Sequence, residues 1–362
     1  MTLQRSLLDW FARHARPLPW RRHYRPYEVW ISEIMLQQTQ MDTVLPYFER
    51  WMRAFPTVRD LARAPQSRVL ELWQGLGYYS RARNLHHSAR LIVERHGGEF
   101  PRDHEAIRSL KGVGPYTAGA ISSIAFGEDR PIVDGNVIRV LARLYAMDAE
   151  PDRSEGSAWW RLQSSLIPPG QARLFNQAMM ELGALVCLPK SPLCADCPVR
   201  SHCRAYQEGR VDELPRPRQR RATERVTAAC IAWVKDGRVL VRRRPEGGIF
   251  GGLWELPEWK LARGSHLEPS RALAALRRHV GDSVDLSPAG VVRRSYTHHQ
   301  ERLHVYTAAG SGPSRDPDGW TVRRVPLSSP GVPLSAAYTR AIERIAASAR
   351  PAERSRGRTQ KA

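Results

Sequence analysis

The spacing of apolar residues divides the chain into a helical part and a later part built mainly of strands. Before Cys187, apolar side chains recur every three or four positions, as in SRVLELWQGL, SRARNLHHSARLIVERH and VIRVLARLY, which predicts amphipathic helices separated by turns. From about Val226 the pattern changes, and VTAACIAWV, a tight turn at 235–237 and RVLVRRR predict a β-hairpin. A helical run, SRALAALRRHV, and two further strands, RRSYTHH and RLHVYTAA, complete this part.

A chain of 362 residues is long enough for two domains, each with its own hydrophobic core. The segment VDELPRPRQRRATER, between the two patterns, is rich in Pro and Arg and predicts an exposed, extended linker. The last residues, RPAERSRGRTQKA, predict a disordered basic tail. No apolar run approaches the ~20 residues of a membrane-spanning helix, so no membrane association is expected.

The charge balance favours a polyanionic partner. The sequence holds 56 Lys and Arg against 36 Asp and Glu, a formal net charge of +20, and nucleic acid is the first candidate. An arginine-rich genome would produce part of the same excess, so the charge alone indicates DNA only weakly.

Four of the five cysteines lie close together with the spacing C-x6-C-x2-C-x5-C: Cys187, Cys194, Cys197 and Cys203. The N-terminus predicts a helix rather than a signal peptide, so clustered thiols indicate a metal centre in a reducing compartment, the cytoplasm, rather than disulfides. Four thiolates at this spacing suit a [4Fe–4S] cluster, and structural zinc is the alternative. The fifth, Cys230, is predicted to be a core residue of a strand.

The segment LKGVGPYTA, at 110–118, has the pattern of a helix-hairpin-helix. A turn at Gly112–Gly114 joins two helices, and Pro115 stands near the first position of the second. Free N–H groups at the start of that helix suit a DNA phosphate. Many G-x-G turns only connect helices, so this motif gains weight from the cysteines and the net charge.

Two carboxylates lie in contrasting settings. Glu33, in VWISEIMLQQTQ, has mainly apolar neighbours at helical spacing, so burial should raise its pKa as a general acid requires. Asp134, in PIVDGNVIRVLAR, stands where a helix begins, and the free N–H groups there should keep it ionised. One protonated and one charged carboxyl can break an N-glycosidic bond. A buried hydrogen-bonded Glu and an ordinary N-cap are the structural alternatives.

These motifs, in this order and spacing, resemble the endonuclease III superfamily of DNA glycosylases. The segments WISEIMLQQTQ, GLGYYSRARNL, GVGPYTAGAISSIAFG and FNQAMMELGALVC are similar in particular to the MutY-type adenine glycosylases, over nearly all of 1–210. The resemblance implies an all-α helix-hairpin-helix glycosylase fold, with a six-helix barrel at about 22–133 and an iron–sulfur domain from 1–21 plus 134–210. It also implies one [4Fe–4S] cluster on the four cysteines and DNA gripped between these two parts.

Residue by residue, the resemblance implies two groups of functional side chains. The reaction centre would comprise Glu33 as general acid, Asp134 as catalytic aspartate, and Tyr116 and Asn136 as supporting residues. The DNA contacts would include Gln38 and Tyr78, which wedge into the duplex while adenine is flipped out, together with Thr39, Leu76, Gly112 and Gly114. For Tyr78, a core aromatic at a helix end is the structural alternative.

One departure from endonuclease III is informative. Where the bifunctional enzymes carry a lysine nucleophile just after G-V-G-x, this chain has Tyr116, which cannot form a Schiff base with the sugar. Lys111 is near in sequence but precedes the turn. The expectation is a monofunctional glycosylase, which removes the base and leaves the backbone intact.

The later part resembles a MutT or Nudix fold, an α+β domain, at VLVRRRPEGGIFGGLWELP. Its expected bounds are 226–346, after a linker at 211–225 and before a tail at 347–362. MutY-type proteins reuse this fold to recognise 8-oxoguanine, and Tyr296, Thr297 and His298 fall on the family's F-S-H segment, where Thr297 and His298 would contact the lesion. The alternative for these three is ordinary strand residues. The helix that would carry magnesium-binding glutamates has Arg277 and Arg278 instead, so no pyrophosphatase activity is expected.

The sequence therefore predicts an adenine DNA glycosylase of base excision repair. It would hydrolyse the N-glycosidic bond of adenine opposite 8-oxoguanine or guanine in double-stranded DNA, as a cytoplasmic monomer associated with the nucleoid through DNA. Three other functions remain open: an endonuclease III-like lyase for oxidised pyrimidines, a non-catalytic iron–sulfur DNA-binding protein, and a Nudix pyrophosphatase tethered to DNA.

Overall fold

The computed structural model describes residues 1–217, 222–245, 248–296, 298–310, 312–313 and 319–348. The chain divides into two compact units, Met1–Ala64 with Arg83–Gln219 and Pro65–Ala82 with Arg220–Ala362. The helical segment at 65–82 thus groups with the strand-rich residues rather than with the helices that surround it in sequence. Within the described parts, no helix is long and apolar enough to cross a membrane.

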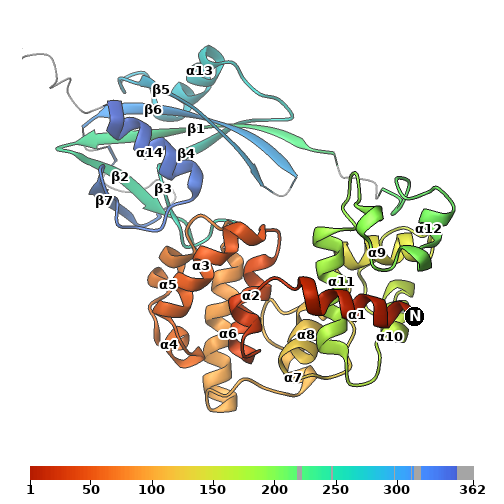
Figure 1. Cartoon of the computed structure of the whole chain (residues 1–362). Coiled ribbons are helices and arrows are strands. Elements are labelled where there is room, and N and C mark those ends of the chain that lie inside the picture. Colours follow the sequence, from red (N-terminus) through yellow and green to blue (C-terminus); the bar gives the residue numbers. More distant parts are fainter. Residues whose placement is uncertain (218–221, 246–247, 297, 311, 314–318, 349–362) are drawn as a thin grey trace, which may run out of the picture. The chain divides into compact units, whose positions relative to one another are not determined.

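The first unit is built of helices (Figure 1). They are α1 (Leu3–His14), α2 (Pro26–Leu36), α3 (Met41–Ala54), α4 (Val58–Arg63), α7 (His104–Arg108), α8 (Pro115–Ala120), α9 (Gly135–Leu144), α10 (Ala158–Leu166), α11 (Ala172–Leu185) and α12 (Arg204–Gln207). Short 3₁₀ turns lie at Pro19–Arg21, Cys194–Asp196 and Arg200–His202, and a π turn at Ile121–Ala125 continues α8. Helix α6 (Ser80–His96) crosses the boundary between the two units, which falls after Ala82.

Helix α2 is the buried centre of the first unit. Every residue from Val29 to Met35 is buried, because the sequence is apolar around most of the helix circumference. The helix packs against α3, α8 and the π turn. A carboxyl on α2 is therefore removed from water.

The segment that follows α1 is attached to α11 by a buried ion-pair cluster. Glu181 has a 1% exposed side chain and binds Arg16 Nε at 2.7 Å and Arg21 Nη2 at 3.1 Å. Burial alone would raise the pKa of Glu181, but hydrogen bonds from the two guanidinium groups hold it at about 2. The cluster connects α11 to the segment that follows α1, and these two parts lie far apart in the sequence.

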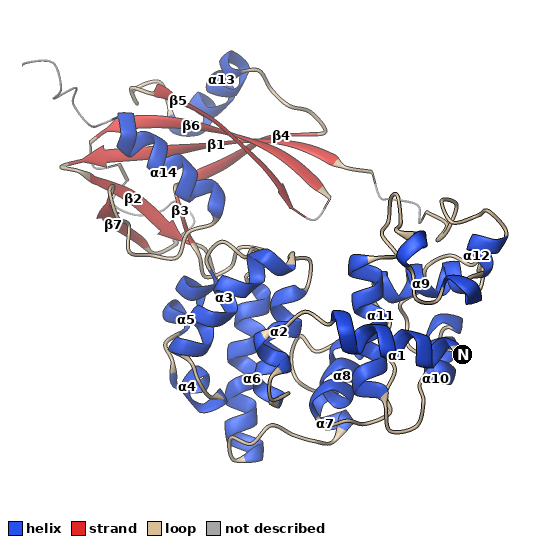
Figure 2. Cartoon of the chain, viewed as in Figure 1, coloured by secondary structure: helices blue, strands red, loops and turns tan. Residues whose placement is uncertain are grey.

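The second unit contains a mixed sheet, shown in red in Figure 2. Its strands are β1 (Glu224–Lys235), β2 (Arg238–Arg243), β3 (Trp254–Glu255), β4 (Glu258–Arg263), β5 (Ser287–Tyr296), β6 (His299–Ala309) and β7 (Val322–Pro326). The order is β3-β2-β1-β6-β5, with β4 also on β1 and β7 on β2. Strands β1 and β6 are parallel, and the other strand pairs are antiparallel.

A helix covers each face of this sheet. Alternate residues of β1, from Ala228 to Ala232, pack with α14 (Ala336–Ser348), and the intervening ones pack with Leu276 of α13 (Pro269–Val280). Both faces of β1 are therefore buried, which explains the unbroken apolar run in its sequence. Helix α5 (Gln66–Trp73) also belongs to this unit.

Most elements expected in the strand-rich part are confirmed. The β1–β2 turn lies at 236–237, within the expected 235–237, with Asp236 and Gly237 both at positive φ, and Cys230 is fully buried. Strands β3, β4 and β7 were not expected, since they are short or mostly polar, and α14 was missed as well. Helix α14 continues to Ser348, two residues into the expected tail, whose remainder lies outside the described residues.

Candidate active site and metal centre

Glu33 lies inside the first unit, on α2, and is only 4% exposed. Burial raises the pKa of its carboxyl to about 7, while a hydrogen bond with Tyr116 opposes the rise. The charge of Asp134 also raises the pKa of Glu33. The direction agrees with the expectation from the apolar helix face, and a carboxyl that titrates near neutrality is suited to general acid catalysis.

Asp134 caps the N-terminus of α9. Its Oδ1 accepts a 2.7 Å hydrogen bond from the Val137 N–H, so Asp134 stands at the start of a helix, as the sequence predicted. Burial nevertheless raises the pKa of Asp134 above its usual value, against the Val137 N–H and the positive charge of Arg153, which lower it. The sequence predicted that the helix start would keep Asp134 ionised. In the structure desolvation has a larger effect on the pKa of Asp134 than the helix start has.

The helix-hairpin-helix brings Tyr116 to these carboxylates. Gly112 has φ +84 in the turn, and Gly114 is the N-cap of α8. A Cβ on Gly119 would collide with the carbonyl oxygen of Pro131, so this glycine lets α8 approach the segment that leads to Asp134. The structure thus brings Glu33, Tyr116 and Asp134 together, from three separate stretches of sequence.

Asn136 connects this centre to the cysteine segment. Its Nδ2 donates to Asp134 Oδ2 at 3.2 Å, and its Oδ1 accepts from Arg139 Nη2 at 2.8 Å. The Nε of Arg139 then donates to the carbonyl oxygen of Cys187 at 2.7 Å. A close approach of α11 to α9 at Gly183, where a Cβ would lie 2.7 Å from the Asn136 Cβ, permits this chain of contacts.

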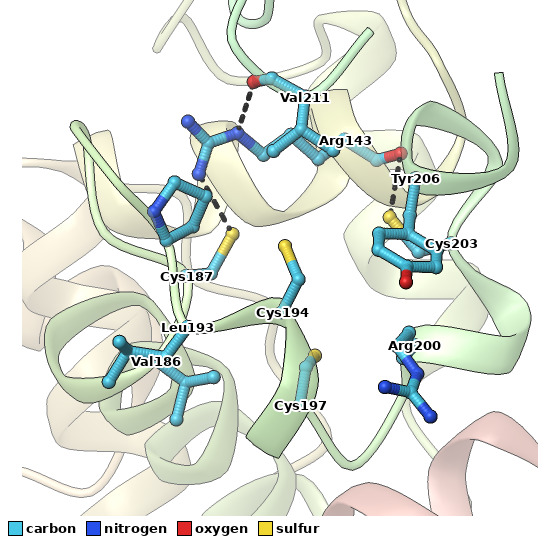
Figure 3. Close-up of a pocket in the computed structure, with 11 residues that line it drawn as sticks. Arg143, Val186, Cys187, Leu193, Cys194, Cys197, Arg200, Cys203, Tyr206 and Val211 are labelled. Atoms are coloured by element: carbon cyan, nitrogen blue, oxygen red, sulfur yellow. Dashed lines mark hydrogen bonds between the residues drawn. The ribbon is translucent and has the colours of Figure 1, made fainter. Parts of the chain in front are cut away.

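The four clustered cysteines line one pocket with free thiols (Figure 3). Arg143 Nη1 donates to Cys187 Sγ at 3.3 Å and to the Leu188 carbonyl at 2.7 Å, while its Nε donates to Val211 and Leu214 carbonyls. Sequence reasoning missed both Arg139 and Arg143. The available signal was their spacing, since they lie three and seven residues after Asn136 and so share one face of α9.

The four thiols are not drawn together as tightly as the ligands of a single bound ion would be. All four cysteines belong to the described residues. Among these residues, no three cysteine sulfurs lie within 4.8 Å of one another. A zinc ion with Zn–S bonds of about 2.3 Å would hold its sulfurs about 4 Å apart. Four thiols that line one pocket are a donor set that fits an iron–sulfur cluster.

Two of the expected DNA contacts follow α2. Gln38 is exposed and has φ +59, a left-handed conformation that is uncommon for a residue other than glycine. Thr39 is partly buried, and its N–H donates to the Leu36 carbonyl at 3.3 Å. A strained, exposed glutamine at the end of a buried helix is a typical feature of a binding site.

The loop that carries Tyr78 lies in the second unit. Tyr78 is 40% exposed and has φ +47, whereas Leu76 is 6% exposed, so Leu76 packs into the protein in this structure. The buried Arg81 donates from Nη2 to the carbonyls of Leu76 and Gly77 at 3.0 and 3.2 Å. The alternative for Tyr78, a core aromatic, does not hold.

The same loop is attached to residues near the C-terminus. The buried Tyr79 donates from its hydroxyl to the Leu334 carbonyl at 3.1 Å, and Gln74 Nε2 donates to Thr339 Oγ1 at 3.2 Å. These bonds join positions separated by 255 and 265 residues. They explain why the segment at 65–82 belongs to the second unit.

Of the expected lesion contacts, His298 is exposed, and Thr297 lies outside the described residues. Tyr296 donates from its hydroxyl to Glu301 Oε2 at 2.5 Å, and its ring stacks on His299. Arg277 and Arg278 lie in the last turn of α13, as expected.

Comparisons with known proteins agree with this geometry. A family model described as "HhH-GPD superfamily base excision DNA repair protein" matches 31–161, and a NUDIX domain model matches 228–344. An adenine DNA glycosylase of Mus musculus is 39% identical over 359 residues, which covers 84% of this chain and 70% of that protein. A thermostable thymine-DNA glycosylase structure has a TM-score of 0.53 and 30% identity over 57% of this chain and 95% of its own. The structure of a trapped endonuclease III–DNA covalent intermediate has a TM-score of 0.50 and 25% identity, and the match covers 57% of this chain and 94% of that chain.

Proposed function

The chain belongs to the adenine DNA glycosylases, enzymes of base excision repair, and on this premise we propose that it removes adenine paired with 8-oxoguanine or guanine by hydrolysis alone, leaving an abasic site. The observation that carries the proposal is the buried group formed by Glu33, Tyr116 and Asp134. It combines a carboxyl that titrates near neutrality with a second carboxyl at a helix start.

In this mechanism Glu33 protonates N7 of the flipped adenine, which makes the base a better leaving group. As the C1′–N9 bond breaks, the sugar becomes oxocarbenium-like, and Asp134 faces the developing positive charge. Glu33, now ionised, takes a proton from the water that attacks the sugar. Tyr116 and Asn136 are positioning residues, because each holds one carboxyl through a hydrogen bond.

Hydrolysis without strand cleavage is supported by the chemistry of the side chain at position 116. The side chain next to Glu33 is the phenol of Tyr116, which cannot form a Schiff base. Burial raises the pKa of this phenol well above its usual value, so it remains a neutral hydrogen-bonding group. Lys111 lies exposed before the turn.

The four cysteines are proposed to hold one [4Fe–4S] cluster, which would fasten the loops at 187–203 to α9. The gathering of all four thiols around one pocket supports this assignment, and the guanidinium of Arg143 supplies positive charge beside Cys187. Anaerobically purified protein should contain iron and sulfide near four of each per chain, on the order expected for one cluster. A colourless protein that contains zinc would refute this assignment.

The decisive experiment uses an end-labelled duplex with one adenine opposite 8-oxoguanine, and A:G and A:T duplexes beside it. We expect strand breaks at that adenine only after hot alkali, and none after neutral denaturation or with A:T. Breaks without alkali, or a covalent adduct trapped by borohydride in good yield, would favour the lyase. Binding without excision, from protein that contains the cluster, would favour a damage sensor.

Recognition of 8-oxoguanine is proposed for the second unit, through His298 and Thr297. The support is the match to the NUDIX domain model and the exposure of His298. Helix α13 carries arginines where a pyrophosphatase would carry magnesium-binding glutamates, so the unit is not expected to hydrolyse nucleotides. Incubation with 8-oxo-dGTP and magnesium should therefore release no pyrophosphate.

Substitution of Tyr79 by Phe should reduce the fraction of the target base that is extruded at equilibrium. The change removes the bond to the Leu334 carbonyl, about 1 kcal/mol, and loosens the loop that carries Tyr78. We expect about a fivefold loss in the equilibrium unstacking of 2-aminopurine placed opposite 8-oxoguanine, measured by its fluorescence.

The matched control is Tyr306→Phe, which removes another tyrosine-to-carbonyl bond of the second unit, to Pro269. If both variants lower the fluorescence change equally, the effect of Tyr79 is one of general stability and not of loop position.

A further inference from the structure

The beginnings of β1 and β6 bring three metal-ligating side chains together in the second unit. The two strands pair in parallel with Glu224 opposite His299, and the Glu224 N–H donates to the His298 carbonyl at 2.8 Å. The backbone ladder therefore places Glu224 beside both histidines before any side chain is considered.

The side chains converge from these backbone positions. One ligand atom each of Glu224, His298 and His299 lies within 4.8 Å of the other two, and among the described residues this is the one such group. Glu224 Oε2 lies 2.9 Å from His299 Nε2, and the two imidazole rings have centroids 4.2 Å apart. His298 is exposed and the other two are partly buried, so an ion from solvent can reach the group.

We propose that Glu224, His298 and His299 form a binding site for a zinc ion. Two imidazole nitrogens and one carboxylate oxygen are the ligand types that zinc takes at about 2.0–2.2 Å, and three protein ligands leave one tetrahedral position for water. The two nitrogen ligands disfavour magnesium and calcium, which prefer oxygen. This site is separate in sequence and in ligand type from the four cysteines.

Occupation of the site would have a consequence for lesion recognition, and this consequence rests on the proposed function. His298 cannot ligate zinc and contact 8-oxoguanine with the same ring nitrogen. Zinc would therefore lower the preference of the protein for 8-oxoguanine over guanine, whereas binding of zinc itself does not depend on that role.

The first test is calorimetric titration of Zn²⁺ into the cluster-loaded full chain, with the visible absorbance of the cluster followed to show that iron stays bound. We expect one zinc to bind per chain that holds its cluster. Zinc bound by the cysteines of any chains that lack the cluster is subtracted. Glu224→Gln and His299→Asn should each weaken binding by about tenfold or more, because each removes one of three ligands. The control is His279→Asn, an exposed histidine on α13, which should bind zinc as the wild type does.

Absence of this binding, or equal affinity in all variants, would overturn the proposal. Thermal unfolding of each variant, compared with that of His279→Asn, shows whether it is folded.

The second test measures binding to duplexes with 8-oxoguanine or guanine, with and without zinc, for the wild type and His298→Ala. Zinc binding with an unchanged preference would leave the metal site standing and remove the lesion role of His298. If the protein binds no zinc but His298→Ala loses the preference for 8-oxoguanine, the metal site would be refuted and the lesion role of His298 kept.

Discussion

Glu33→Gln is expected to slow adenine excision by orders of magnitude while binding to the A:8-oxoguanine duplex is retained. Glutamine preserves the size of the side chain but carries no transferable proton, and general acid catalysis contributes roughly 10²–10⁴-fold to such reactions. The single-turnover rate should fall by about this factor, with an unchanged dissociation constant measured by gel shift.

Glu28→Gln is the matched control, because Glu28 lies on the same helix and pairs with Arg25 near the surface. Its rate should equal that of the wild type. Excision by Glu33→Gln at the wild-type rate would remove Glu33 from the mechanism and favour a structural role.

The pH dependence tests the same residue independently. Burial raises the pKa of Glu33 to about 7, and the acid must be protonated to act, so the wild-type rate should fall as the pH rises through about 7. Stability should follow in the same direction. The folded state holds this proton more tightly than the unfolded state, in which the pKa of Glu33 is near 4.5. The free energy of unfolding should therefore fall by about 3 kcal/mol as the pH rises from about 4.5 to about 7. Glu33→Gln should not show this decrease in denaturant titrations at pH 5 and 8.

Asp134→Asn is expected to lower the single-turnover rate by about 10²–10³-fold with little loss of stability. Asparagine caps a helix as well as aspartate does, so the bond from the Val137 N–H can remain, while the negative charge that would face the developing cation is lost. Because the charge of Asp134 also raises the pKa of Glu33, the residual activity should decline at a lower pH than that of the wild type.

Asp103→Asn is the matched control, since Asp103 is the N-cap of α7 and accepts from the Glu105 N–H at 3.2 Å. It should leave both rate and pH profile unchanged. A stability loss in Asp134→Asn without a rate loss would reduce Asp134 to an ordinary N-cap.

Features that depend on a few neighbouring residues were determined by the sequence alone. The turn at 112–114, the cap at Asp134, the β1–β2 hairpin and the set of four cysteines each follow from local backbone preference or from spacing along the chain. The burial of Glu33 also followed, because an apolar helix face must be covered.

Only the tertiary structure decided how these features combine. The pKa of Asp134 depends on desolvation by distant elements, and the approach of α8, which carries Tyr116, to the segment before Asp134 depends on the space that Gly119 leaves for Pro131. The bond from Tyr79 to Leu334 spans 255 residues, and Glu224 meets the two histidines through a parallel pairing of β1 and β6. Local patterns carry no information about such partners, because burial and packing are properties of the whole fold.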